Sequence, residues 1–105
     1  MAQWDVYPNP NPRARGDLPF LVDIQSDLLS SLHTRLMVPC APASLAPPGL
    51  PRRMSPELEV AGQRVLLVPQ EAGAVDVSAL PRAVASLRSE AHRIVDALDA
   101  VVSGV

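Results

Sequence analysis

Hydrophobic and polar residues near the C-terminus repeat with the period of an α-helix. The apolar positions are spaced by four, three, four, three and four residues, which places them on one side of a helix. Gly104 stands where a left-handed turn would end that helix. The sequence predicts a long helix that begins between Ser78 and Ser86 and runs to Ser103. Its apolar stripe consists of Leu87, Ala91, Ile94, Leu98, Val101 and Val105.

Alternating apolar and polar residues earlier in the chain predict short β-strands. In the clearest of them, Phe20, Val22 and Ile24 point to one face of the sheet. Pro39 is expected to end the third strand, and Gly62 to turn an antiparallel hairpin. The predicted strands are residues 3–7, 18–25, 35–40, 57–61, 63–69 and 75–77.

Two proline-rich segments separate these strands. Residues 8–17 and 41–56 are predicted to be loops, because proline removes backbone donors and fixes φ. The order of elements, five strands or more followed by one helix, indicates an α+β fold. We expect a single domain over residues 1–105, built as a small antiparallel β-sheet or partly open barrel with a long C-terminal α-helix laid on it.

Composition limits the classes of protein that fit. The 105 residues are 48% apolar but only 3% aromatic, so Val, Leu and Ala must build the core. No apolar run approaches the roughly 20 residues that cross a bilayer, and the N-terminal residues lack the pattern of a secretory signal. The single Cys40 cannot form an intramolecular disulfide, which indicates a cytoplasmic location. A formal charge of −2 argues against direct binding of nucleic acid.

The sequence offers little support for catalytic or metal chemistry. His33, His92 and Cys40 do not have the spacing of a zinc or iron site. Ser86, His92 and Asp96 include the residue types of a hydrolase triad, but no Gly-x-Ser-x-Gly turn accompanies them. No glycine-rich phosphate loop is present. We therefore expect no catalytic residue, no cofactor and no metal.

Two other features suit a contact surface. Asp96 and Asp99 lie in the last helical turns, where the helix dipole disfavours acidic side chains, so they either keep that face solvated or meet a basic partner. Leu28 and Leu29 are adjacent, and in an extended segment at least one of them is not expected to reach the core. Both exposed beside the helix end would form a contact patch. The spacing of the apolar stripe also permits packing against a second subunit.

Four segments of the chain match a known family: FLVDIQSDLL (20–29), RLMVP (35–39), VDVSAL (75–80) and the helix that ends in Gly104 and Val105. They resemble the CcdB family, the toxins of plasmid toxin–antitoxin systems. The resemblance covers nearly the whole chain, apart from the loop near residue 10 and a rewritten connection over residues 40–56. It implies a homodimer of partly open, SH3-like barrels that is not an enzyme and needs no cofactor. Members of this family bind the A subunit of DNA gyrase, trap its complex with cleaved DNA, and are neutralised by a CcdA-like antitoxin.

The resemblance also implies contact residues. The family's antitoxin docks on the first loop, which here carries Arg13 and Arg15. The family's tail carries a tryptophan where this chain has Ser103, and an asparagine where it has Asp99. Loss of an aromatic interface residue typically costs about 2 kcal/mol or more, roughly thirtyfold in affinity. By position, the gyrase contacts fall on Leu28, Leu29, Asp99, Ser103, Gly104 and Val105.

Two other functions remain open at this point. The chain resembles RNA-cleaving toxins similar to MazF in its expected barrel, and Arg52, Arg53 and Glu57 would supply an acid or base beside a phosphate-binding arginine. Alternatively, the fold is a gyrase-inactive homologue retained to bind an antitoxin. An assay with gyrase and DNA, and separately with RNA, distinguishes the three.

Overall fold

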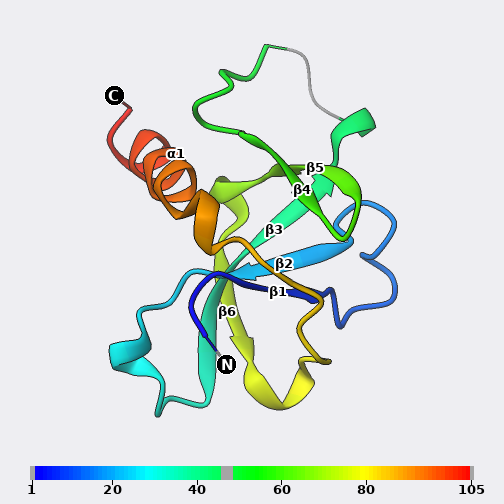
Figure 1. Ribbon diagram of the computed structural model, residues 1–105, viewed down its shortest axis with the longest axis vertical. Coiled ribbons are helices and arrows are strands. Elements are labelled where there is room, and N and C mark those ends of the chain that lie inside the picture. The colour runs from blue at the N-terminus through cyan, green and yellow to red at the C-terminus, as the bar shows by residue number, and fades with distance from the viewer. Residues whose placement is uncertain (1, 46–48, 105) are drawn as a thin grey trace.

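The computed structural model describes residues 2–45 and 49–104 and contains an antiparallel sheet that curves into a nearly closed barrel, with one C-terminal helix (Figure 1). The predicted α+β class is therefore confirmed. The sheet has seven strands, in the order β4-β5-β3-β2-β1-β7, with β6 paired to β3 beside β5. The strands are β1 (Asp5–Pro8), β2 (Phe20–Asp23), β3 (Thr34–Pro42), β4 (Glu57–Val60), β5 (Gln63–Leu67), β6 (Gly73–Asp76) and β7 (Ala85–Ser86), and the helix is α1 (Ala91–Ser103).

Strand β3 organises the sheet because it pairs with three other strands. One edge pairs with β2, from Cys40 opposite Phe20 to Met37 opposite Asp23. The other edge pairs first with β6 and then with β5. The prediction that Pro39 ends this strand is wrong. Proline lacks only the backbone donor, and the Pro39 carbonyl still accepts from the Val68 amide at 2.9 Å.

Two other predicted strand boundaries shift for local reasons. The first strand begins at Asp5 because Trp4 has φ of +76°, outside the extended region. The hairpin turn consists of Ala61 and Gly62, which both have positive φ. A two-residue turn of this kind has a backbone twist that matches the right-handed twist of the two strands it joins. The hairpin itself is confirmed, with Val60 opposite Gln63.

The core lies on the inner face of the sheet. Val22 and Phe20 face this core with Ile24 beside them, as the alternating pattern predicts. Leu21 points to the opposite side, where it joins Tyr7 and Met37 in a smaller buried cluster. Most main-core residues are aliphatic: Val6, Phe20, Val22, Val38, Cys40, Leu58, Val60, Val65, Leu67, Leu87, Ile94 and Ala97.

Helix α1 is shorter than predicted. It begins at Ala91, because the preceding residues complete the edge of the sheet. Ala85 pairs with Val6, and the amide of Leu87 donates to the carbonyl of Trp4 at 2.8 Å. Two 3-10 turns flank β7: η4 (Val77–Ala79) precedes it, and η5 (Arg88–Glu90) lies between it and the helix. The predicted end is confirmed: Gly104 has φ of +72°, and its amide donates to Ala100.

The apolar stripe of α1 packs on its own sheet. Ile94 is fully buried, Ala91, Leu98 and Val101 are half-buried, and Leu87 is buried just before the helix. Val105 lies outside the described residues. Within residues 2–45 and 49–104, no helix is long and apolar enough to span a bilayer.

Candidate functional site

An exposed apolar turn follows strand β2. Residues Asp27–Leu29 form the 3-10 turn η1, in which Leu28 is 93% exposed and Leu29 is 48% exposed. Ser26 caps this turn, because its hydroxyl accepts from the amide of Leu28 at 3.2 Å. The sequence predicted that one of the two leucines would not reach the core. In the structure neither side chain is buried, since a 3-10 turn replaces the expected extended segment.

No side chain from residue 26 to residue 33 is buried, so apolar packing does not hold this turn. Hydrogen bonds hold it instead. The side chain of the buried Gln25 makes three hydrogen bonds, one of them to the turn itself and two to strand β3. Its amide nitrogen donates to the carbonyls of Leu29 at 3.2 Å and Thr34 at 3.1 Å, and its amide oxygen accepts from the Leu36 amide at 3.0 Å. One side chain thereby joins the turn to the start of β3.

A buried ion pair lies under the same turn. Arg35 Nε donates to Asp23 Oδ2 at 2.8 Å, and its Nη2 donates to the Gln25 carbonyl at 3.1 Å. Asp27 extends the network to the surface: its Oδ1 lies 3.5 Å from Arg35 Nη2 and accepts from the amide of Gln3 at 3.0 Å. Burial raises the pKa of the Asp23 carboxyl, an effect that the hydrogen bonds from Arg35 and the Gln25 amide oppose.

The exposed end of α1 is the second candidate contact element. Asp99, Ser103 and Gly104 are exposed, and Val102 is 87% exposed. The hydroxyl of Ser103 donates to the Asp99 carbonyl at 2.6 Å, so this side chain turns back onto its own helix. A serine here projects no large apolar group to a partner.

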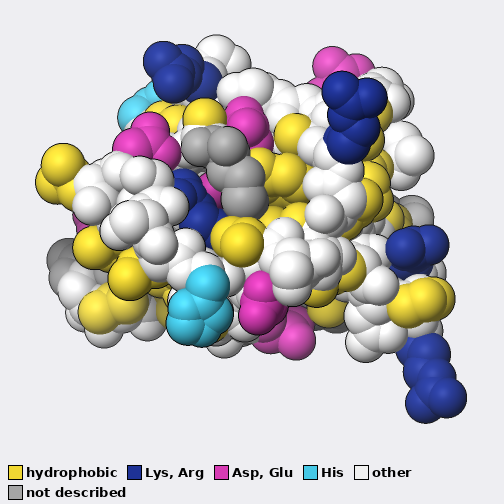
Figure 2. Space-filling view, turned by 90° about the horizontal axis from the view of Figure 1, so that it is seen from below, with side chains coloured by type: hydrophobic (Ala, Val, Ile, Leu, Met, Phe, Trp, Pro, Cys, Tyr) yellow, Lys and Arg dark blue, Asp and Glu magenta, His cyan; other side chains and the backbone are white. Residues whose placement is uncertain are grey.

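The two elements do not lie beside each other within one chain, contrary to the expected single patch. In Figure 1 the C-terminal end of α1 is at the upper left, and η1 is at the lower left. Figure 2, seen from below, shows hydrophobic side chains gathered on the left, the side of the 26–33 loop. The physical reason is that α1 leaves the sheet edge at β7 and runs away from the end of β2 that carries the turn.

The arginine-containing loop lies on the opposite side of the sheet, at the right of Figure 1. Its shape depends on the buried Asn9, whose side-chain amide donates to Leu18 O at 2.8 Å. Arg15 Nε donates to Asn9 O at 2.7 Å, which ties this arginine to the loop. Arg13 is exposed at the same loop. Residues 9–18 therefore form an ordered basic surface remote from η1.

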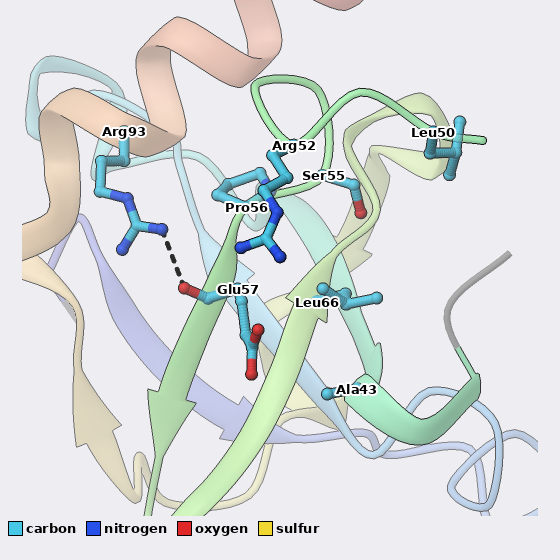
Figure 3. Close-up of a pocket in the computed structure, with 8 residues that line it drawn as sticks. All are labelled: Ala43, Leu50, Arg52, Ser55, Pro56, Glu57, Leu66 and Arg93. Atoms are coloured by element: carbon cyan, nitrogen blue, oxygen red, sulfur yellow. Dashed lines mark hydrogen bonds between the residues drawn. The ribbon is translucent and has the colours of Figure 1, made fainter. Parts of the chain in front are cut away.

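A cavity of about 250 Å³ lies between the 49–56 segment, the β4–β5 hairpin and α1 (Figure 3). Arg52, Glu57 and Arg93 line it, and Arg93 Nη2 donates to the Glu57 carbonyl at 2.9 Å. The Glu57 carboxylate pairs with Arg64 at 2.9 Å, and this contact lowers the pKa of Glu57. A carboxyl with a lowered pKa is a poor general acid at neutral pH.

Of the three residues of the nuclease hypothesis, Arg52 and Glu57 line this cavity together, and Arg53 does not. Arg53 makes two hydrogen bonds of 3.1 Å to the carboxylate of Asp96, and so connects the rewritten loop to the helix. Of the two interpretations of Asp96, solvation of the helix face or contact with a basic partner, the ion pair supports contact with a basic group. That group belongs to the same chain. Asp96 is thereby committed to Arg53 rather than to a triad with His92. Ser86 Oγ accepts from the Arg88 amide at 3.3 Å.

The remaining candidate ligands are dispersed. Within the described part of the chain, no three His, Cys, Asp or Glu side chains lie close enough to hold a metal ion. Cys40 is fully buried, and burial raises its pKa to about 12.

Sequence reasoning missed the residues that support the apolar turn. The alternation places Asp23 and Gln25 on the face of their strand opposite Phe20 and Val22, and on that face both are buried and hydrogen-bonded. The sequence did contain a signal for this buried cluster. Asp23 and Gln25 alternate with the apolar residues of their strand, and the next strand carries the basic Arg35. That pattern is ambiguous, because a solvated face has the same spacing.

The geometry defines the class first: a small α+β barrel with an exposed apolar turn, a basic loop and an exposed helix end. A family model described as CcdB protein matches residues 3–104, and the chain belongs to the CcdB family. The resemblance noted in the sequence is thus confirmed. Members of this family are toxins of toxin–antitoxin systems that poison DNA gyrase. Among the curated proteins, none matches the chain closely.

Proposed function

We propose that this protein is a toxin that binds the A subunit of DNA gyrase, traps the cleaved-DNA complex and is neutralised by a CcdA-like antitoxin. The observation that carries the proposal is the family match over residues 3–104. In this mechanism the protein makes and breaks no bond of its own. It acts by binding a partner whose reaction is already under way.

The η1 turn is the proposed first gyrase contact. Burying one leucine side chain contributes about 1.5–3 kcal/mol, and Leu28 is almost completely available for such burial. The turn is held by buried groups, so little conformational entropy is lost when a partner binds it. Asp99, Ser103, Gly104 and Val105 are the proposed second contact, with Val105 outside the described residues.

A homodimer would bring two copies of these elements to one partner. Val95 and Val102 lie seven residues apart on the exposed side of α1, at 43% and 87% exposure. Residues at this spacing share one helix face and suit contact with a helix of a second copy. The basic loop with Arg13 and Arg15 is the proposed antitoxin surface, since exposed arginines suit an acidic segment.

One observation favours a second candidate function. Ser103 is turned onto its own helix by the bond to Asp99, so the tail lacks an aromatic contact. A homologue with this tail would be gyrase-inactive and retained for antitoxin binding. The nuclease alternative is less well supported, because Arg53 and Glu57 are each paired elsewhere.

A cleavage assay tests the proposal. Purified protein is incubated with gyrase, supercoiled DNA and ATP, and the reaction is stopped with detergent and protease. Linear DNA that increases with protein concentration supports a gyrase poison. No linear DNA, with tight binding of a co-expressed antitoxin, supports the antitoxin-binding module instead. Shortened RNA in a parallel incubation would contradict the non-enzymatic mechanism.

A further inference from the structure

We propose that Gln25 is a positioning residue for gyrase binding: its buried amide holds the η1 turn so that Leu28 and Leu29 stand ready for a partner. The inference rests on the proposed function for its binding consequence. Its structural part concerns the free protein alone. The gyrase contact itself is assigned to the two leucines, and Gln25 acts through them.

The loop that carries η1 has no buried side chain of its own. Residues 26–33 are eight consecutive exposed positions, so burial of apolar side chains does not stabilise their conformation. Without other support, the backbone entropy lost on ordering these residues would disfavour a single conformation. The loop must therefore be held by polar contacts with the core.

Gln25 is the buried side chain that links the turn to strand β3. Its Nε2 joins Leu29 O on one side of the loop to Thr34 O on the other, so both ends of the 30–33 segment meet at one amide group. Its Oε1 accepts from the Leu36 amide, which orients the side chain. The Gln25 backbone is held as well, by Asp23 at its amide and by Arg35 at its carbonyl.

Asp27 provides a second and weaker tie from the solvent side. Its carboxylate accepts from the Gln3 amide at 3.0 Å and lies 3.5 Å from Arg35 Nη2. Gln25 and Asp27 thus tie the turn itself to the buried cluster of Asp23, Gln25 and Arg35, and the far end of the loop is held separately, where the Val77 amide donates to the His33 carbonyl at 2.9 Å. A change in that cluster would move the leucines without altering either leucine.

Gln25→Met is the decisive variant, because methionine has a similar shape and forms none of the three hydrogen bonds. Amide hydrogen exchange is measured by NMR on the free protein. We expect the amides of Leu29 and Ser30 to exchange about tenfold faster or more, while those in the centre of β2 and β3 are unchanged. Unaltered exchange in the turn would overturn the proposal, whether or not the protein binds gyrase.

The binding test uses the purified A subunit of gyrase and a double-mutant cycle. Gln25→Met should weaken binding about tenfold in the natural background, and should have almost no further effect once Leu28→Ser and Leu29→Ser are both present. Additive losses would contradict the positioning role, because Gln25 would then act independently of the leucines. Absence of binding by the natural protein would instead reject the proposed function.

Two further variants separate positioning from loss of stability. Asp27→Ala changes an exposed residue, so it should leave the fold intact and still accelerate exchange in the turn. Ser55→Ala removes a hydrogen bond to the Leu67 carbonyl that has no contact with the loop. Ser55→Ala is the control, and it should lower the urea midpoint without changing exchange at Leu29 or gyrase binding. Equal effects of Ser55→Ala and Gln25→Met on binding would reduce Gln25 to a structural residue and refute the proposal.

Discussion

The guanidinium of Arg35 donates to the carboxylate of Asp23 at 2.8 Å, with 1% and 0% of the two side chains exposed. A charge pair so deeply buried is costly to form, and its geometry must be good to offset desolvation. Here both partners also make hydrogen bonds to Gln25. The VDIQSD and RLMVP segments, which carry the family resemblance, therefore meet in the fold beneath the exposed apolar turn.

Replacing Arg35 alone should be strongly destabilising. Arg35→Met leaves the Asp23 carboxylate buried without its cation, and we expect a loss of about 3–5 kcal/mol in the free energy of unfolding. Urea denaturation measures this loss. Combined with Asp23→Leu, the same change should cost less than Arg35→Met alone, since no buried charge remains. Arg53→Ala, at an exposed ion pair, is the control and should shift the urea midpoint little. A double variant less stable than Arg35→Met would contradict this account.

The exposed leucines should matter for gyrase and not for folding. Leu28→Ser and Leu29→Ser together should reduce trapping of cleaved DNA roughly tenfold or more, because each leucine would lose its apolar contact with the partner. The stability of the free protein should stay within about 0.5 kcal/mol. Leu45→Ser is the matched control, since Leu45 has similar exposure to Leu29 and lies in another 3-10 turn. If the control reduces trapping as much, the turn is not the contact.

Restoring an aromatic residue at the helix end should strengthen the interaction. In Ser103→Trp the side chain no longer bonds to Asp99 O and projects a large apolar ring. We expect up to roughly thirtyfold tighter binding of the gyrase A subunit, measured by titration. Ser103→Ala, which removes the same hydrogen bond without adding a ring, should bind like the natural protein. Unchanged binding by Ser103→Trp would remove the tail from the proposed site.

Cys40 should be inert in the folded protein. Burial raises its pKa to about 12, so almost no reactive thiolate is present near pH 8. A disulfide reagent such as DTNB should label the native protein only as fast as it unfolds, and should label one thiol at once in urea. Rapid labelling of the native protein would show that the side chain is accessible.

Acid should weaken the fold partly through Asp76. Its Oδ1 accepts from the Ser78 amide at 2.9 Å and from the Ser78 hydroxyl at 2.8 Å, and these bonds lower its pKa. A lowered pKa means that the unfolded chain binds the proton more readily. The stabilisation is therefore complete above about pH 4, where the unfolded carboxyl is ionised, and is lost as pH falls through the folded pKa. Urea midpoints between pH 5 and pH 2.5 should fall less steeply in Asp76→Asn. An NMR titration should place the Asp76 pKa higher in Ser78→Ala, and an unchanged value would refute this role of the hydroxyl.

The sequence alone was sufficient for features that depend on neighbouring residues. The alternation of Phe20, Val22 and Ile24 predicted the core face of β2, and Gly104 marked the end of the helix through its tolerance of positive φ. The four matching segments, the VDIQSD block among them, identified the family, which the match over residues 3–104 confirmed. Periodicity and turn chemistry act over a few residues, so they can be read directly from the chain.

Tertiary pairing decided what the local pattern left open. Residues 78–90 have enough helical character to extend the predicted helix, yet Ala85 pairs with Val6, since the open edge of β1 offers backbone partners. Asp23 and Gln25 look like a solvated face until Arg35 and the loop carbonyls are placed beside them. Polar residues are buried only where a partner distant in sequence satisfies their hydrogen bonds. The sequence therefore determined six of the seven strands, the family and the exposure of at least one leucine, and the tertiary structure alone decided how that turn is held.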